Sequence, residues 1–183
     1  MIGIHLRGLV AAVVLGVATP AFATSQIPEW IIVNGTRHAL LDQPLHQWMK
    51  DAKAFARIKP FLRRGASTAL GRGYRGTWEI RGDTLYLIAL DNRGHESPGT
   101  IQPEYVIPLD ALFPPEAEET FPADGAVPAT WYTGQLVVGQ GNWTQPPDSG
   151  WEGQYESYLQ FDVRSGRIIS QGPNGKSRPP AEP

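Results

Sequence analysis

The residues best suited to chemistry gather in two short segments of this 183-residue chain. The segment DNRGHESPG contains His95 and Glu96, and an imidazole beside a carboxylate is a common pair for general acid–base catalysis. The segment GRGYRG places Arg72, Tyr74 and Arg75 directly before a run of strand-forming residues. Arginine and aromatic side chains often anchor protein interfaces. The first segment is therefore a candidate site for hydrolysis, and the second is a candidate site for binding.

Two tryptophans extend the candidate binding surface. Trp143 and Trp151 lie in GQGNWTQPPDSGWEGQ, whose glycines and prolines predict a long loop over residues 139–154. A structural alternative applies to these tryptophans and to the arginines before the strand, because boundary side chains also shield the ends of a sheet. The sequence leaves both interpretations open.

Complete catalytic motifs are missing from the sequence. It contains neither G-x-S-x-G nor S-x-x-K for a serine nucleophile, and it lacks H-E-x-x-H and the spacings of calcium and zinc sites. Gly71, Gly73 and Gly76 match G-x-G-x-x-G, but they precede a predicted strand and do not open a helix, as a dinucleotide site requires. We therefore expect no metal and no cofactor. A non-enzymatic role is favoured, although the sequence does not decide it.

Charged residues are unevenly distributed along the chain. Residues 53–75 contain seven basic residues and no acid, whereas residues 104–124 contain six acids and no base. The formal net charge of −2 is too small to indicate nucleic acid or a membrane surface as the partner. The basic segment is either an ordinary solvated surface or a region that attracts an anionic partner.

The first 23 residues have the three-part layout of a secretory signal peptide. Arg7 precedes the apolar stretch GLVAAVVLGVA, and Ala21 and Ala23 form a small-x-small pattern before Thr24. The apolar stretch is shorter than the roughly 20 residues that a membrane-spanning helix needs. We therefore expect cleavage after Ala23, no membrane anchor afterwards, and a periplasmic or secreted bacterial protein. The chain has no cysteine, which excludes disulfides and thiol catalysis.

Tight turns and strand-forming runs predict most of the fold. Asn34-Gly35 favours a type I′ hairpin turn, and further turns are predicted at Gly82-Asp83 and Ser165-Gly166. The run LYLIAL is apolar at every position, which predicts a strand covered on both faces.

One amphipathic helix is predicted between Pro44 and Pro60, because apolar residues recur there at helical spacing. The expected stripe comprises Leu45, Trp48, Met49, Ala52, Phe55 and Ala56. Residues 24–171 are thus expected to form one α+β domain. It would have about seven strands in hairpins, a mainly antiparallel sheet that can curl strongly, and the N-terminal helix packed on it. Residues 172–183 are rich in proline and are expected to form a disordered tail.

Several segments resemble a family of small uncharacterised bacterial proteins. They are RGYRGTWEIRGDTLYL, ALFP, WYTGQLVV and YESYLQFDV, in this order. The resemblance spans Ile31 to Ile169 and implies one intact domain, but this family brings no established activity. The triplet Gly76–Trp78 is also similar to the glycine-x-tryptophan of lipocalin-like proteins, which implies a cavity for a small ligand.

These observations favour an exported, soluble, non-enzymatic binding or inhibitor-like protein, for example of the immunity type. Its partner would be a protein or a small molecule. Two alternatives stay open: an envelope hydrolase that uses His95 and a carboxylate, and a small-ligand carrier with a lipocalin-like cavity.

Overall fold

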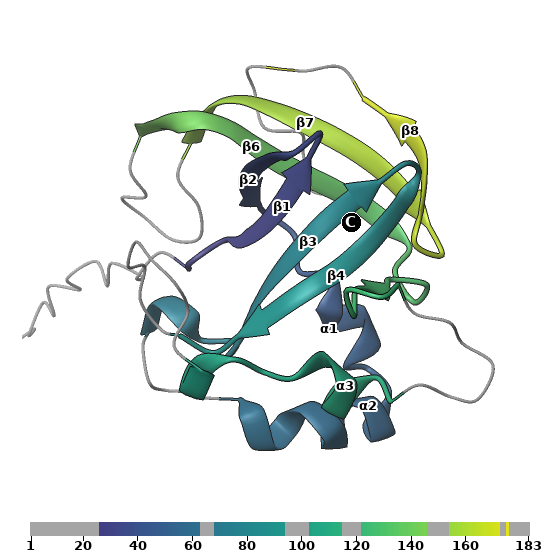
Figure 1. The fold of residues 1–183 in the computed structure, drawn as a ribbon. Helices are drawn as coiled ribbons and strands as arrows, with labels where there is room; N and C mark the ends of the chain where they lie inside the picture. The colour runs from purple at the N-terminus through teal and green to yellow at the C-terminus, as the bar shows by residue number, and fades with distance from the viewer. Residues whose placement is uncertain are drawn as a thin grey trace, which may run out of the picture.

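Eight strands form a single mixed sheet in the computed structural model, which describes residues 26–62, 68–93, 103–114, 122–145, 154–172 and 175 (Figure 1). The strands are β1 (Glu29–Val33), β2 (Thr36–Leu40), β3 (Arg75–Arg81), β4 (Thr84–Asp91), β5 (Val127–Pro128), β6 (Gly134–Gln145), β7 (Gln154–Arg164) and β8 (Arg167–Gln171). The prediction of a mainly antiparallel sheet with little helix is therefore confirmed.

The sheet closes on itself. The strand order is β3-β1-β2-β6-β7-β8-β4-β5, and β3 also pairs with β4, so seven strands form a ring, and the short strand β5 pairs with β4 next to its contact with β8. The contact between β4 and β8 is short, with Thr84 opposite Arg167. Only the pair β1–β3 is parallel among the strand pairs of the described residues. The sequence did not predict this parallel pair, which joins segments more than 40 residues apart.

The three predicted hairpin turns are confirmed. Asn34 and Gly35 both have positive φ angles, 51° and 77°, as a type I′ turn requires, and they connect β1 to β2. Gly82 lies in the turn between β3 and β4, and Ser165 and Gly166 lie in the turn between β7 and β8. Local turn chemistry therefore sets the register of these three hairpins.

The prediction of one helix from Pro44 to Pro60 is wrong. The chain forms two shorter helices, α1 (Leu45–Trp48) and α2 (Ala52–Ile58), followed by the 3-10 helix η1 (Lys59–Phe61). Asp51 separates them, because its extended backbone lets its carboxylate accept hydrogen bonds from the backbone N–H groups of the next turn. Ala52 and Ala56 of the predicted stripe are consequently exposed.

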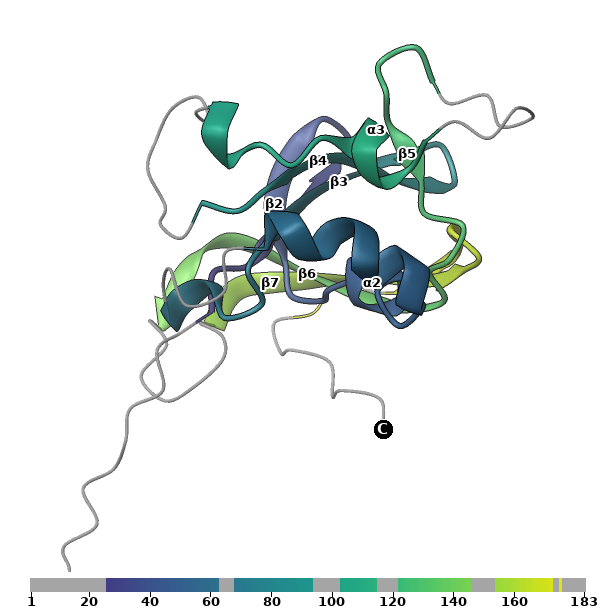
Figure 2. The same cartoon turned by 90° about the horizontal axis from the view of Figure 1, so that it is seen from below.

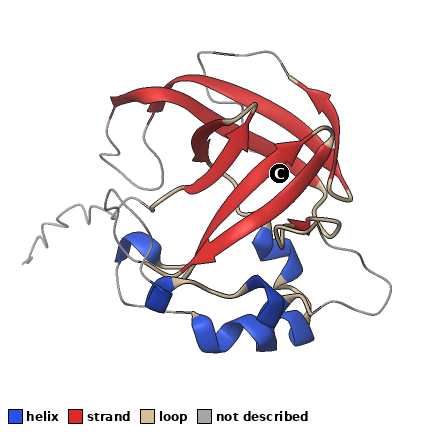
Figure 3. Ribbon diagram, viewed as in Figure 1, coloured by secondary structure: helices blue, strands red, loops and turns tan. Residues whose placement is uncertain are grey.

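The helices lie together at one end of the closed sheet (Figures 1 and 2). The remaining ones are short: η2 (Thr68–Leu70), η3 (Pro103–Tyr105) and α3 (Leu109–Leu112). Leu45, Ile58 and Leu112 join the same core as the strands, so α1, α2 and α3 close this end of the sheet (Figure 3). No helix among the described residues is long and apolar enough to span a membrane.

Large side chains fill the core of the closed sheet. They come from alternate positions of the strands: Ile31, Val33, Trp78, Leu85, Leu87, Leu136, Val138, Leu159, Phe161 and Val163. Within LYLIAL, Leu85 and Leu87 are buried while Tyr86 and Ile88 are half-buried, so the strand is covered more completely on its core face than on its other face. The side chains that alternate with the core positions lie on the outer face of the ring.

Strand β6 is longer than predicted. The sequence places a loop after Val138, but β6 continues to Gln145, and Trp143 pairs with Tyr155 of β7. The expectation that Trp143 lies in a loop is therefore wrong. Irregular pairing between Gln140 and Gln145 lets the ladder pass through the glycine-rich segment that favoured a loop.

Candidate functional site

The candidate residues Arg72, Tyr74 and Arg75 do not form an exposed surface. Tyr74 is 0% and Arg75 is 2% exposed, and the Arg72 side chain is 10% exposed. The expectation of an open arginine–tyrosine surface is therefore wrong, because the parallel pairing of β1 with β3 and the helical end enclose this segment. Arg72 still reaches a pocket, described below, and its role in binding stays a prediction.

Arg75 forms a buried ion pair whose hydrogen bonds are satisfied on the carboxylate side. Its Nε and Nη2 atoms each donate a hydrogen bond to Oδ2 of Asp91, and each donor–acceptor distance is 3.1 Å. The other oxygen of Asp91 accepts the backbone N–H of Arg93 at 3.0 Å. Both side chains are 2% exposed. This pair links the start of β3 to the end of β4, and its geometry is that of a structural contact.

Arg72 and Glu29 form a second buried pair with poorer geometry. Arg72 Nε lies 3.6 Å from Oε1 of Glu29, and neither atom makes a hydrogen bond with the described residues. Arg72 Nη2 donates to the backbone carbonyl of Ile27 at 2.7 Å. The other oxygen of Glu29 accepts a 2.5 Å hydrogen bond from Trp78 Nε1. One carboxylate oxygen thus accepts a hydrogen bond, and the other lies within ion-pair distance of the guanidinium without a hydrogen bond.

Gly76 makes the contact between Glu29 and Trp78 possible. A Cβ atom at Gly76 would lie 2.5 Å from Glu29 Oε2 and 2.6 Å from Trp78 Nε1. These distances are too short for a side chain, so the third glycine of G-x-G-x-x-G serves the packing of β1 against β3. This observation gives the motif a structural explanation in place of a nucleotide site.

Burial raises the pKa of Glu29 to about 7. The nearby Arg72 and the hydrogen bond from Trp78 favour the charged carboxylate, but desolvation outweighs them. Such a carboxyl group could exchange a proton near neutral pH. It lines neither of the two pockets described below, however, so it has no direct contact with a substrate bound there. Its geometry does not fit general acid–base catalysis at these sites.

A first pocket, the Arg72 pocket, has a volume of about 410 Å³. It lies where α1 and α2 meet the segment before β3. Met49 and Phe55 give it apolar walls, and its polar lining comes from Gln26, Gln43, His46, Lys50 and Arg72. None of the described residues that line it is acidic, so the pocket is basic as well as apolar.

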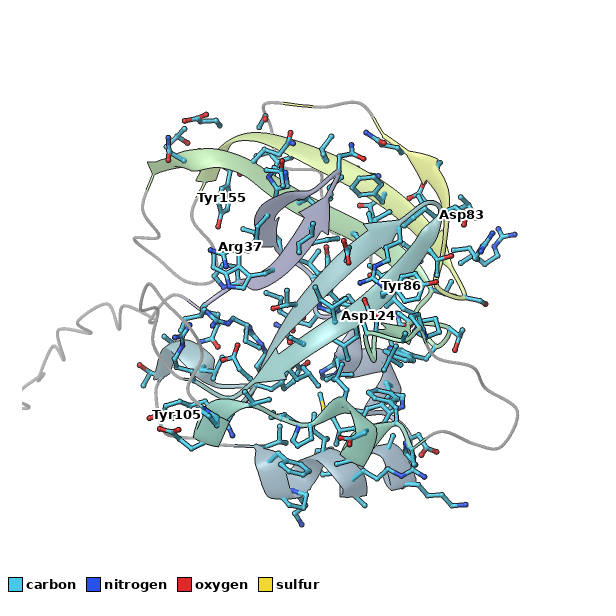
Figure 4. All side chains as sticks on the ribbon, in the orientation of Figure 1. Arg37, Asp83, Tyr86, Tyr105, Asp124 and Tyr155 are labelled. Carbon is cyan, nitrogen blue, oxygen red and sulfur yellow. The ribbon has the colours of Figure 1, made fainter. Side chains whose placement is uncertain are left out.

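A second pocket, the Trp30 pocket, has a volume of about 500 Å³. It lies on the outer face, where β1 and β2 adjoin β6 and β7. Its lining includes Trp30, Thr36, Arg37, His38, Asn142 and Tyr155. In Figure 4, Arg37 and Tyr155 lie close to each other at this part of the sheet. Partial burial lowers the pKa of His38, which favours its neutral form at pH 7.

Arg37 is exposed and held in place by stacking. Its guanidinium carbon lies 4.7 Å from the ring centre of Trp30. It forms no ion pair with another residue in the described part of the chain. The Trp30 pocket therefore presents one oriented cation beside two aromatic side chains.

Several predicted residues lie outside the described residues. These are His95 and Glu96 of the proposed acid–base pair, and Trp151 of the predicted loop. The backbone of Trp143 belongs to β6, next to Asn142 of the Trp30 pocket. No group of three or more potential metal-ligating side chains occurs among the described residues.

Glu29, Trp30 and Arg37 were not among the residues predicted from the sequence. Glu29 begins an apolar strand and Arg37 follows a hairpin turn, positions at which polar residues are ordinarily exposed. Only the parallel pairing of β1 with β3 shows that Glu29 is buried against Trp78. The sequence offered one usable signal, which was an aromatic residue and an arginine on opposite strands of a predicted hairpin.

Neither a protein-family model, nor a curated protein, nor a solved structure matches this chain. The resemblance to small bacterial proteins therefore stays a prediction.

Proposed function

We propose that this protein is an exported, non-enzymatic binding protein that holds a protein partner through the Trp30 pocket. The observation that carries the proposal is the oriented guanidinium of Arg37, which lies on the Trp30 ring at the edge of a pocket that Tyr155 also lines. Tryptophan, tyrosine and arginine are the residue types that most often dominate interface energies.

The charge of the pocket favours a partner with an acidic side chain. Arg37 has no acidic neighbour within ion-pair distance among the described residues, and His38 is mainly neutral at pH 7. A carboxylate from the partner can accept two hydrogen bonds from a guanidinium in a fork geometry. Stacking on Trp30 already restricts Arg37, which lowers the entropy lost on binding.

The aromatic side of the pocket is closely packed. Tyr155 packs on Gly139, where a Cβ atom would lie 2.5 Å from the tyrosine ring. Its ring also meets Tyr158 in an edge-on arrangement, with centroids 6.2 Å apart. Paired strands hold these residues, so the aromatic part of the pocket is formed before a partner arrives.

Export is part of the proposal and can be tested separately. The signal-like layout of residues 1–23 supports it. We expect the protein from the periplasm or the medium to begin at Thr24, as measured by intact mass. Retention of residues 1–23 in the cytoplasm would contradict export.

The binding proposal is tested by affinity capture from cell-envelope extract of the source organism. The variants are Trp30→Ala and Arg37→Gln, with Arg164→Gln as a control because Arg164 is also exposed but lies near the turn after β7. A partner captured by the wild type and by Arg164→Gln, but lost from Arg37→Gln, supports the proposal. Equal capture by Arg37→Gln, or no partner of the wild type, contradicts it. Circular dichroism checks the fold of Trp30→Ala.

The two other functions stay predictions. The hydrolase requires His95 and Glu96, which lie outside the described residues. The carrier with a lipocalin-like cavity requires an empty interior, whereas large side chains occupy the core of the closed sheet.

A further inference from the structure

The Arg72 pocket combines apolar walls with cationic groups from separate segments. Met49 and Phe55 supply apolar surface, Lys50 follows α1, and Arg72 precedes β3. Lys50 is exposed and forms no ion pair within the described part of the chain. A ligand that enters this pocket therefore meets unpaired positive charge beside apolar side chains.

Arg72 gives independent evidence for an anionic ligand. Its side chain is 10% exposed, yet its Nε makes no hydrogen bond and lies 3.6 Å from the nearest carboxylate oxygen, that of Glu29. A buried cation that is incompletely paired is unfavourable, because the loss of hydration is not fully replaced. Arg72 Nη2 donates to the carbonyl of Ile27, and Glu29 is its ion-pair partner at 3.6 Å, so an anion in the pocket would add a second and closer electrostatic partner.

We propose that the Arg72 pocket is a binding site for a small amphiphilic carboxylate, a carboxylate group attached to a short apolar chain. The carboxylate lies between Lys50 and Arg72, and the chain packs on Met49 and Phe55. The amide of Gln43 also lines the pocket and can donate a hydrogen bond to the carboxylate, whereas Gln26 Nε2 already donates to the carbonyl of Thr68. This site is separate from the Trp30 pocket and does not rest on the function proposed there.

Glu29 makes this site sensitive to pH. Its Oε1 atom lies 3.6 Å from Arg72 Nε, Arg75 of β3 and Asp42 after β2 also act on its charge, and Glu29 in turn acts on Tyr132 before β6. When Glu29 is ionised, it repels a carboxylate ligand and competes for Arg72. When it is protonated, Arg72 is released to the ligand. Ligand affinity is therefore higher at pH 6 than at pH 8.

The test uses isothermal titration calorimetry of the purified protein with octanoate. Octanol serves as the uncharged analogue with the same chain, and inorganic phosphate serves as an anion without a chain. Saturable binding of octanoate that exceeds both by at least about tenfold supports the site, since tenfold corresponds to one ordinary charge-assisted contact. Equal affinity for octanol overturns the charge requirement, equal affinity for phosphate overturns the apolar requirement, and no binding of octanoate overturns the proposal.

Variants locate the binding and separate it from folding defects. Lys50→Gln should weaken octanoate about tenfold, and Lys53→Gln, a change of the same type on an exposed position of α2, should leave it unchanged. Trp30→Ala should also leave it unchanged, which distinguishes this site from the Trp30 pocket. Unaltered affinity in Lys50→Gln, or an equal loss in Lys53→Gln, contradicts binding at this site.

The pH dependence is tested with Glu29→Gln. The wild type should bind octanoate more tightly at pH 6 than at pH 8, and the variant should lose most of this difference. His46→Gln controls for protonation of the imidazole that also lines the pocket. A pH difference that persists in Glu29→Gln and disappears in His46→Gln would overturn the role of Glu29. An equal affinity of the wild type at both pH values would do so too.

Discussion

Two buried carboxylate–guanidinium interactions lie near the start of β3 and differ in quality: Arg75 begins β3, and Arg72 precedes it. Arg75 and Asp91 meet through two hydrogen bonds of 3.1 Å, and the remaining oxygen of Asp91 accepts a backbone N–H. Arg72 and Glu29 approach only to 3.6 Å, and the facing atoms Nε and Oε1 make no hydrogen bond with the described residues. The two arginines, Arg72 and Arg75, are three residues apart in the sequence.

The difference between the two pairs shows that burial does not by itself make an ion pair stabilising. A buried pair offsets its desolvation cost only when hydrogen bonds replace the lost water. The pair of Arg75 and Asp91 meets this condition on the carboxylate side, so it acts as a structural contact between β3 and β4. The pair of Arg72 and Glu29 does not meet it, and the raised pKa of Glu29 is the result.

Breaking the satisfied pair should give the largest effect. Asp91→Ala leaves the Arg75 guanidinium buried without its partner, and we expect the free energy of unfolding to fall by about 3–5 kcal/mol. Urea denaturation measures the loss. Asp124→Asn is the control, because Asp124 is exposed and its pair with the half-buried Arg81 is open to solvent and should contribute little. A similar small effect of both changes would contradict the structural role of Asp91.

Removing the negative charge of Glu29 should raise the free energy of unfolding near neutral pH, whereas Asp91→Ala lowers it. The pKa of Glu29 is about 7 in the folded state against 4.5 for the ordinary group, so the folded state binds the proton more tightly than the unfolded state. The free energy of unfolding should therefore fall as pH rises from about 4.5 to 7, by about 3 kcal/mol in total.

In Glu29→Gln the amide oxygen can still accept the hydrogen bond from Trp78, but the side chain cannot ionise. We expect the variant to lack this decline and to be more stable than the wild type at pH 8. Thermal unfolding from pH 5 to pH 8 in both proteins measures the difference, and comparing the two removes the contribution of other titrating groups. Parallel pH profiles would show that Glu29 is not the group responsible.

A smaller effect is expected at the glycine that admits the Glu29–Trp78 contact. Gly76→Ala places a methyl group 2.5 Å from Glu29 Oε2, which must displace the hydrogen bond and should cost about 1–3 kcal/mol. Gly71→Ala is the matched control, since its Cβ would lie 3.4 Å from the nearest atom. Chemical denaturation that ranks the two variants equally would contradict this account of Gly76.

Local features of the sequence were sufficient for the hairpins but not for the helical region. Asn34-Gly35 requires two positive φ angles, which few other residue pairs adopt, so the turn could be predicted from two residues. The stripe between Pro44 and Pro60 has helical spacing, yet Asp51 caps a new helix and divides it. Periodicity describes which positions are apolar. It does not show where a side chain competes for the backbone N–H groups.

The candidate site was predictable only in part. Arg72 was selected from the sequence and does line a pocket, whereas Tyr74 and Arg75 are buried. Glu29 and Trp30 were not selected, because an acidic residue and an aromatic residue at the start of a strand are ordinarily explained as exposed to solvent. Their environment depends on β3, which follows more than 40 residues later.

The sequence by itself determined the three hairpin turns, the β-rich character of the domain and the absence of cysteine chemistry. These depend on backbone preferences of one to four neighbouring residues and on composition. The tertiary structure alone decided the closure of the sheet, the parallel pairing of β1 with β3, and the contrast between the two buried pairs. Each of these depends on distances of a few ångströms between residues that are remote in sequence, which no local pattern specifies.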